Sequence, residues 1–251
     1  MTAVVGWLCK DGVVIGSDSA ITFSTGTQFT IEQTGDKIFI IGEKVIIAGS
    51  GGVGFQQRFC NVVQSAYDNK LFTNNYIDVG RALSGFLNND LASTRADRGQ
   101  YCALLAYASG DNFYLCEFTI RDFQPEWKDS KVKFASIGCG QNITDPFLAF
   151  MKKVFLGEKE QPTVAQAKFI TYWTLSHVCE LNPGGIKEPI QMAQLMKNEK
   201  GYFMATKLGE AELDEHGAIT KEAISYLGKF KDQIIGKTAK KIPSIESNSK
   251  P

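Results

Sequence analysis

Residues 2–19, Thr-Ala-Val-Val-Gly-Trp-Leu-Cys-Lys-Asp-Gly-Val-Val-Ile-Gly-Ser-Asp-Ser, decide the expected fold of this chain. Apolar and β-branched residues fill 4–8 and 13–16, which predicts two strands. The turn residues Asp11 and Gly12 lie between these stretches, so the strands are expected to form a hairpin. An antiparallel start of this kind argues against a doubly wound parallel sheet.

The rest of the chain continues as blocks of strands and pairs of helices. A second hairpin is predicted where apolar residues 37–41 and 45–48 flank a turn at 42–44. Apolar residues recur every three or four positions in four stretches, which predicts helices at 53–69, 77–91, 143–156 and 163–180. Apolar runs bounded by turns predict strands at 101–108, 113–119, 132–137, 190–196 and 202–204. This order predicts an α+β fold, a four-layer α/β/β/α sandwich of two stacked antiparallel sheets.

The chain is expected to be one main domain with an addition at its C-terminal end. Residues 1–204 contain all the predicted strands and form this domain. Residues 205–236 form an appended segment, in which apolar periodicity predicts a helix at 221–235. Residues 237–251 are polar, so we expect a flexible tail there.

Composition excludes several classes of protein. Lys and Arg total 27 of the 251 residues and Asp and Glu also total 27, so the formal net charge is zero. A dedicated nucleic-acid binder needs a basic surface, and therefore no nucleic-acid partner is expected. No apolar run reaches the roughly 18 residues of a membrane span, and residues 1–6 lack the pattern of a signal peptide. We therefore expect a cytoplasmic protein without a membrane segment.

The cysteines and histidines point away from metal and histidine chemistry. The six cysteines are widely spaced and form no Cys-x-x-Cys pair, so we expect no metal site and no cofactor. His177 lies in an apolar helical stretch and His216 in an acidic turn, and neither has an evident acidic partner. An enzyme built on this chain is therefore expected to use a general base other than histidine.

Residues 49–54, Gly-Ser-Gly-Gly-Val-Gly, offer one alternative. They match the Gly-x-Gly-x-x-Gly pattern of dinucleotide-binding loops, after a predicted strand and before a predicted helix. That interpretation also requires a second parallel strand ending in an acidic residue about twenty positions later. Residues 55–75 have a helical pattern instead, which disfavours nucleotide binding.

Thr2 offers a nucleophile that needs no histidine. Removal of Met1, which a small second residue favours, would make Thr2 the first residue of the chain. Its α-amine would have an unperturbed pKa of about 7.7–8.0 and could accept the proton of its own hydroxyl group. A nearby lysine would lower the pKa of that amine further through like-charge repulsion.

At this point the sequence resembles the proteasome β-subunit superfamily, which includes the bacterial HslV peptidase and smaller bacterial proteasome homologues. The resemblance extends over residues 2–204, and its most specific motifs are at 2–6, 11–19, 36–38 and 48–51. Weaker matches follow at 136–140, similar to the family's Gly-Ser-Gly turn, and at 180–185, similar to an acidic residue followed by a glycine pair.

The resemblance implies a set of catalytic roles. Thr2 matches the nucleophile, Lys37 the catalytic lysine, and Asp18 the aspartate that pairs with that lysine. Gly49 matches the residue whose backbone N–H stabilises the tetrahedral oxyanion. A hairpin centred on 11–12 would also place Asp18 opposite Val5, about 10 Å along the strand from Thr2, a gap that a lysine could close.

The resemblance also implies accessory and substrate-binding residues. Cys139 stands where the family has the serine of the Gly-Ser-Gly turn, and Glu180 matches the acidic residue before the glycine pair. Ile21 and Thr22 match positions that line the substrate groove, where an extended peptide would pair as an added strand.

The function implied is that of an N-terminal threonine peptidase, a threonine-type endopeptidase of the Ntn-hydrolase class. It would cleave peptides or unfolded polypeptides through an acyl-enzyme on Thr2, inside a homo-oligomeric ring or related closed assembly. The sequence does not identify an ATPase partner. Two alternatives stay open: a catalytically silent ring or scaffold subunit, which a retained Met1 would favour, and a hydrolase for a small amide or one specific peptide.

Overall fold

The computed structural model describes residues 1–24, 29–96, 99–157, 160–181 and 184–234. Two five-stranded sheets form its centre. The first sheet has the order β10 (Phe134–Ile137), β1 (Val4–Leu8), β2 (Gly12–Ser17), β11 (Gln191–Lys197) and β12 (Phe203–Lys207). The second has the order β5 (Ile38–Ile41), β6 (Val45–Ser50), β7 (Cys102–Ser109), β8 (Asn112–Phe118) and β9 (Pro125–Trp127). We call them the β1 sheet and the β5 sheet.

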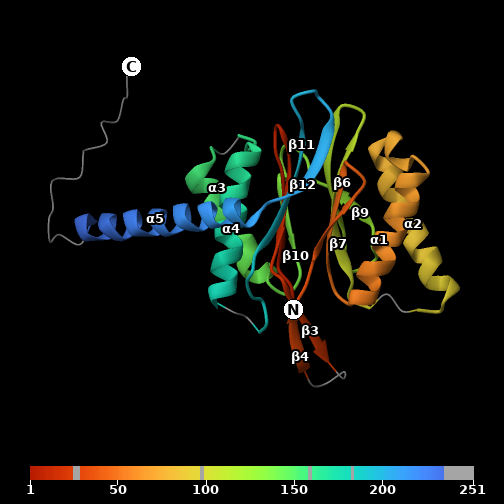
Figure 1. Cartoon of the computed structure of the whole chain (residues 1–251), viewed down its shortest axis with the longest axis horizontal. Coiled ribbons are helices and arrows are strands. Elements are labelled where there is room, and N and C mark those ends of the chain that lie inside the picture. Colours follow the sequence, from red (N-terminus) through yellow and green to blue (C-terminus); the bar gives the residue numbers. More distant parts are fainter. Residues whose placement is uncertain (25–28, 97–98, 158–159, 182–183, 235–251) are drawn as a thin grey trace, which may run out of the picture.

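Helices cover the outer faces of both sheets (Figure 1). Helices α1 (Val53–Asp68) and α2 (Tyr76–Ser93), with the short 3₁₀ helix Leu71–Thr73, lie against the β5 sheet. Helices α3 (Gln141–Phe155) and α4 (Val164–Leu181) lie against the β1 sheet. The described strand pairs are all antiparallel, and this mixture of helices with antiparallel sheets is what the sequence predicts.

Three apolar clusters hold these elements together. The cluster between the sheets includes Ile15 and Leu195 from the β1 sheet and Ile46 and Leu104 from the β5 sheet. A second cluster joins the β1 sheet to α3 and α4, and a third joins the β5 sheet to α1 and α2. Burial of this apolar surface fixes how the two sheets face each other.

The antiparallel sheets remove the dinucleotide alternative. Strand β6, which leads into residues 49–54, pairs antiparallel with both β5 and β7. A dinucleotide fold needs the next strand to run parallel to β6. The glycines instead join an antiparallel strand to α1.

The first hairpin has a different register from the one predicted. Val4 lies opposite Ser17, so the turn is centred on 10–11 and Asp18 lies beside Ala3, not opposite Val5. The prediction was wrong because it assigned Gly12 to the turn. Gly12 belongs to β2, where a Cβ atom would collide with the Leu195 carbonyl of β11, so its glycine serves strand packing.

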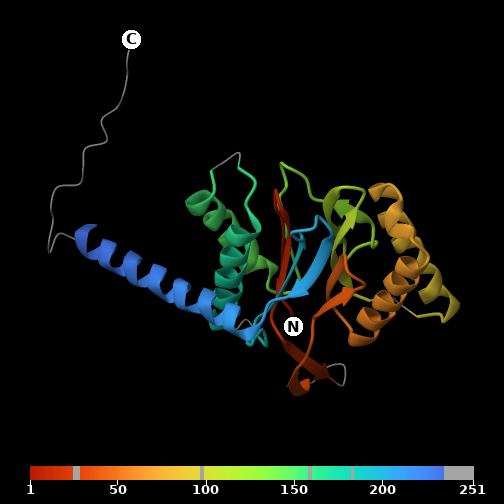
Figure 2. The ribbon, with the colours of Figure 1, turned by 45° about the horizontal axis from the view of Figure 1, so that its top comes forward.

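Three strands of the structure were not predicted from the sequence. Strands β3 (Ala20–Ser24) and β4 (Phe29–Thr34) form a separate two-stranded sheet that projects from the molecule beside the N-terminus (Figure 2). Apolar and polar residues alternate in both strands, at 21–24 and at 29–32, so the pattern was present although no strand was predicted there. Strand β9 has only three residues and pairs with the end of β8.

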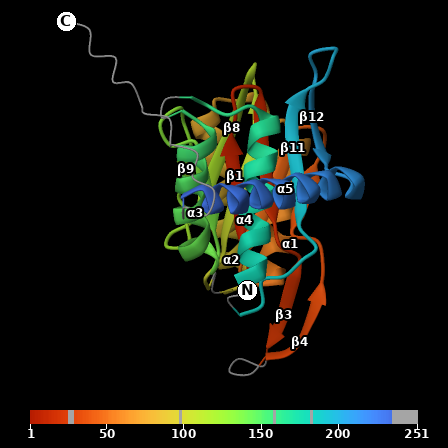
Figure 3. The same ribbon diagram turned by 90° about the vertical axis from the view of Figure 1, so that its left-hand side faces the viewer.

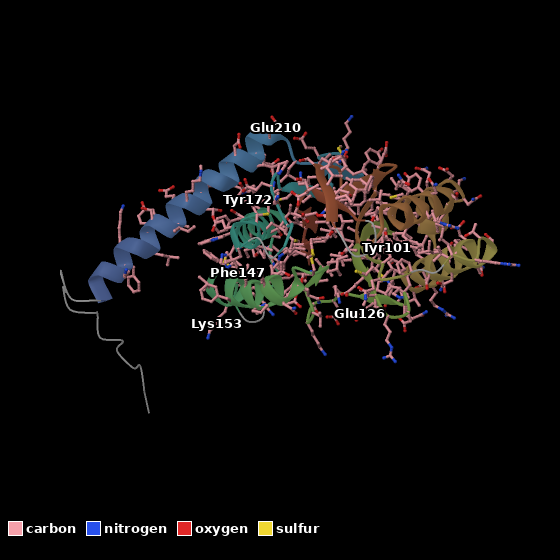
Figure 4. All side chains as sticks on the ribbon, turned by 90° about the horizontal axis from the view of Figure 1, so that it is seen from below. Tyr101, Glu126, Phe147, Lys153, Tyr172 and Glu210 are labelled. Carbon is pink, nitrogen blue, oxygen red and sulfur yellow. The ribbon has the colours of Figure 1, made fainter. Side chains whose placement is uncertain are left out.

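The C-terminal helix is longer than predicted. Helix α5 (Glu210–Ile234) begins eleven positions before the expected start at 221 and crosses α4 (Figure 3). His216, which we placed in an acidic turn, lies inside α5 beside Tyr172 of α4, which Figure 4 labels. Burial lowers the pKa of His216, with Lys168 adding to the effect. The predicted tail at 237–251 lies outside the described residues.

None of the described helices combines the length and the apolar character needed to cross a membrane.

Candidate active site

The site lies where one end of the β1 sheet meets one end of the β5 sheet. Thr2 precedes β1 and Asp18 follows β2, so both belong to the β1 sheet. Lys37 precedes β5 and Gly49 lies in β6, so both belong to the β5 sheet. The chain therefore brings together residues from two sheets that share no strand ladder.

Lys37 and Asp18 form a buried ion pair. Lys37 Nζ lies 2.9 Å from each carboxylate oxygen of Asp18, and the two side chains are 8% and 0% exposed. The Asp18 carboxylate also accepts hydrogen bonds from the backbone N–H groups of Ala3 (3.0 Å) and Ala20 (3.1 Å). These donors anchor the carboxylate, so it holds the lysine at a defined point.

Lys37 also reaches the hydroxyl group of Thr2. Its Nζ donates to Thr2 Oγ1 at 3.2 Å and to the Met1 carbonyl at 3.0 Å. Thr2 Oγ1 donates in turn to the same Met1 carbonyl at 2.6 Å. Thr2 is only 7% exposed, so its hydroxyl lies in a sheltered place beside a cation.

The surroundings of Lys37 lower its pKa. Burial disfavours the charged ammonium and is the largest effect, whereas the charge and hydrogen bonds of Asp18 oppose it. Cys179, on α4, is close enough to this pair for Asp18 to add to the burial that raises the pKa of the thiol to about 12. The Cys179 thiol is therefore neutral at ordinary pH.

Cys139 contacts the main chain of Thr2. Thr2 N donates to Cys139 Sγ at 3.2 Å, and the Thr2 carbonyl accepts a hydrogen bond from Gly140 N at 3.2 Å. The loop before α3 therefore holds the main chain of Thr2. Cys139 is the exposed cysteine among the six.

Gly49 borders the same space as Thr2 and Lys37. A Cβ atom at this position would collide with Gln56 Oε1 and come within 2.8 Å of the Tyr101 hydroxyl. Tyr101 donates a hydrogen bond to Gln56 Oε1 at 3.0 Å, which fixes the amide of Gln56 beside the site. Glycine is therefore the residue that lets β6 pass this close to Gln56.

Two cavities flank Thr2. One, of about 430 Å³, is lined by both predicted groove residues, Ile21 and Thr22, together with Lys37, Gly49 and Gln56. The other, of about 390 Å³, lies on the Cys139 side and is lined by Ser50, Gln100, Glu117 and Gln141 among others. Thr2 therefore borders two separate cavities.

Glu180 stands apart from this cluster. It lies near the end of α4 with an exposed side chain, while its neighbours Val178 and Cys179 turn inward. Among the residues that the structure describes, its carboxylate has no hydrogen bond or ion pair with Thr2, Lys37 or Cys139. The following Asn182 and Pro183 lie outside the described residues.

Two other residues at the site, Gln191 and Gln56, were not predicted from the sequence. Gln191 of β11 contacts the main chain on both sides of Asp36, accepting from Lys37 N at 3.0 Å and donating to the Gly35 carbonyl at 2.8 Å. Gln56 borders the larger cavity. Isolated glutamines belong to no motif, so only the folded structure connects them with Lys37 and Gly49.

No metal-binding arrangement accompanies the cluster. In the described part of the chain, no group of three or more His, Cys, Asp or Glu side chains is placed to hold a metal ion. His177 stacks on Phe147 of α3 at 4.5 Å between ring centroids. The hydrogen-bond partners of Thr2 Oγ1 in the described structure are the Lys37 ammonium and the Met1 carbonyl.

Solved structures with the same fold are known. Anbu from Hyphomicrobium sp. strain MC1, as a Gly-1 mutant, has a TM-score of 0.69 and 11% identity, with 91% of this chain and 97% of that chain covered. The helical assembly of the Anbu complex from Pseudomonas aeruginosa gives 0.69 and 13%, with 99% and 100% covered. Anbu, an ancestral β-subunit, from Yersinia bercovieri gives 0.67 and 12%, with 94% and 99% covered.

Sequence comparison assigns the family. No curated protein matches the chain. The family model described as proteasome subunit matches residues 2–181, which contain Thr2, Asp18, Lys37 and Gly49. This match spans more than half of the chain, and the three solved structures named above are proteasome-like Anbu proteins. The chain therefore belongs to the proteasome subunit family.

Proposed function

We propose that this chain is an N-terminal threonine peptidase with the four-layer architecture of the Ntn hydrolases. The observation that carries the proposal is the bridge made by Lys37, whose Nζ contacts the Asp18 carboxylate at 2.9 Å and Thr2 Oγ1 at 3.2 Å. A buried lysine with a lowered pKa, held against a hydroxyl group, is a typical means of activating a nucleophile.

Removal of Met1 would complete the site. It would turn Thr2 N into an amine, 3.2 Å from Cys139 Sγ and on the residue that carries the nucleophile. It would also free Thr2 Oγ1 and Lys37 Nζ, which both donate to the Met1 carbonyl in the unprocessed chain. The Lys37 ammonium would lower the pKa of the new amine through like-charge repulsion, so more of it would be neutral and able to accept a proton.

Peptide hydrolysis would then take two steps. Thr2 Oγ1 attacks the substrate carbonyl carbon while its proton passes to the Thr2 amine, and the Gly49 N–H stabilises the oxyanion. Collapse expels the leaving amine, which takes the proton, and leaves an ester on Thr2. Water activated by the same amine hydrolyses this ester and restores the Thr2 hydroxyl. Ile21 and Thr22 would line the path of the substrate.

The proposal includes a closed or helical homo-oligomer of this chain. A helical assembly of the Anbu complex is known from Pseudomonas aeruginosa, and that structure covers 99% of this chain. In this proposal residues 1–204 form the catalytic domain and residues 205–236 form an appended segment. Exposed Ile224, Tyr226 and Leu227 on α5 supply apolar surface for contacts between copies.

The test is an intact mass of the purified protein before and after treatment with a peptide epoxyketone. We expect a chain without Met1 that gains one inhibitor, because this reagent needs both a hydroxyl group and a free amine on the same residue. Thr2→Ala should stay unlabelled. A chain that keeps Met1 and forms no adduct, or a processed chain that resists a panel of epoxyketone side chains, would favour the silent subunit instead.

A further inference from the structure

The segment that carries Lys37 is held from the other sheet. Lys37 lies in the β5 sheet, whereas its partners Asp18 and Thr2 belong to the β1 sheet. The position of the ammonium group therefore depends on how residues 35–37 dock against the β1 sheet. Strand β11 supplies that contact through the side chain of Gln191.

Gln191 is placed for this contact by the alternation of its strand. Ala193 and Leu195 of β11 belong to the apolar cluster between the sheets, whereas Met192 belongs to the cluster beneath α3 and α4. Side chains two positions apart share a face of a strand, so Gln191 faces the space between the sheets. Gln191 also lies opposite Ser17, the residue before Asp18.

The amide of Gln191 is used at both ends. Its Oε1 accepts from Lys37 N at 3.0 Å, and its Nε2 donates to the Gly35 carbonyl at 2.8 Å. Only a side chain with one acceptor and one donor on the same planar group can bind both main-chain atoms at once. Lys37 is buried, so loss of the amide would leave its N–H without a partner and would favour movement of the segment.

We propose that Gln191 is a positioning residue for the threonine peptidase reaction, because its amide fixes residues 35–37 so that Lys37 Nζ reaches Asp18 and Thr2 Oγ1. Only the kinetic readout of this inference rests on the proposed peptidase function. Its structural content, the place of the Lys37 ammonium, can be measured without any turnover.

The ionisation of Lys37 reports on that place. The titratable groups that face it are the Asp18 carboxylate, the thiols of Cys139 and Cys179 and, once Met1 is removed, the Thr2 amine, and burial is the main reason that its pKa is lowered. A looser segment would expose the ammonium to water and weaken the effect of burial. The pKa of Lys37 would then rise towards its ordinary value.

The experiment compares Gln191→Met with Gln194→Met in the full-length chain. Gln194 is the matched control, since it lies in the same strand on the opposite face and donates to Thr206 Oγ1 at 3.4 Å. The first readout is the second-order rate of epoxyketone adduct formation. The second is a ¹³C NMR titration of the Lys37 side chain, with its signal assigned by its absence in Lys37→Met.

Gln191→Met should slow adduct formation about 100-fold, the usual cost of misplacing a reacting group by about 1 Å. It should also raise the pKa of Lys37, whereas Gln194→Met should leave that pKa unchanged and the rate within about twofold. If Gln191→Met does not fold, Gln191→Leu serves in its place, because it likewise removes both the acceptor for Lys37 N and the donor to the Gly35 carbonyl without adding a charge that would itself shift the pKa of Lys37.

Two outcomes would overturn the inference. One is a Lys37 pKa in the folded Gln191 variant equal to that of the wild type. The other is equal slowing by the Gln191 and Gln194 variants. If the wild type itself forms no adduct, the peptidase proposal fails, and the NMR titration still decides the positioning role by itself.

Discussion

Two buried lysines in this molecule have similar exposure and similar ion pairs, but their pKa values are shifted in opposite directions. The side chains of Lys37 and Lys128 are 8% and 5% exposed, and each forms an ion pair at 2.9 Å, with Asp18 and Glu117 respectively. Burial by itself acts to lower the pKa of both lysines. In Lys37 this effect prevails over one carboxylate, so the pKa is lowered. In Lys128 the two carboxylates of Glu117 and Glu126 outweigh it, so the pKa is raised.

The difference lies in what else each ammonium contacts. Lys128 faces two carboxylates, which favour its charged form. Lys37 has one carboxylate, and its other contacts are the Thr2 hydroxyl and the Met1 carbonyl, which carry no charge. A buried lysine with a single anion beside a hydroxyl group is therefore suited to chemistry, whereas one between two anions is suited to holding strands together.

The largest expected difference between the two lysines is in the rate of acylation. Lys37→Met should slow epoxyketone adduct formation on Thr2 by about 10²–10⁴-fold, because it removes a group that assists proton transfer. Lys128→Met is the matched control and should label at nearly the wild-type rate. Equal slowing in both variants would mean that Lys37 is structural, as Lys128 is.

Stability should separate the two carboxylate partners next. Asp18 is fully buried, so Asp18→Asn leaves the Lys37 charge without its only anion and should cost about 3–5 kcal/mol of unfolding free energy. Glu117→Gln leaves Lys128 paired with the more exposed Glu126 and should cost about 1 kcal/mol. Urea unfolding measures both. A smaller loss for Asp18→Asn than for Glu117→Gln would contradict the comparison.

The pH dependence of stability should have opposite signs for the two lysines. The pKa of Lys37 is lower in the folded chain than its unfolded value near 10.5, so the unfolded state binds more protons and Lys37 makes stability rise as pH approaches 10.5. The pKa of Lys128 is raised, so its contribution is complete below 10.5 and is lost as pH rises through the folded value.

Alkaline unfolding titrations of the two methionine variants test these signs. The stability of the wild type relative to Lys37→Met should increase as the pH rises towards about 10.5, the unfolded value. The stability of the wild type relative to Lys128→Met should decrease above pH 10.5, on the same grounds. The same slope in both differences would show that the two lysines sit in equivalent surroundings.

The smallest expected effect comes from removing one anion from Lys128. Glu126 is more than half exposed, so Glu126→Gln should cost little stability, but it should lower the pKa of Lys128. The shift can be followed by ¹³C NMR of the lysine side chain, with Lys131 as a surface reference. No shift would mean that Glu117 alone sets the ionisation of Lys128.

Much of this arrangement could be predicted from residues close together in the sequence. The hairpin of β1 and β2 and the hairpin of β5 and β6 follow from apolar runs and turn residues. The sequence motifs contain Thr2, Asp18 and Lys37, and the fold brings these three residues together. Their chemical roles stay predictions until acylation is measured. Local patterns succeed here because a hairpin is decided by its own turn and strands.

Features that depend on distant packing could not be predicted. Gly12 was assigned to a turn although its small size serves the approach of β11, which lies almost 180 residues later in the chain. Gln191 contacts Lys37 from 154 residues away. The early start of α5 was missed because residues 210–220 are mostly polar. Their packing against α4 becomes evident only in the folded structure.

The division of the site between two sheets gives its chemistry a mechanical sensitivity of its own. Thr2 and Asp18 move with the β1 sheet and Lys37 moves with the β5 sheet, so the 3.2 Å contact between Lys37 Nζ and Thr2 Oγ1 measures how closely the sheets are stacked. Sliding of one sheet over the other by about 1 Å would break that contact while every strand ladder stayed intact.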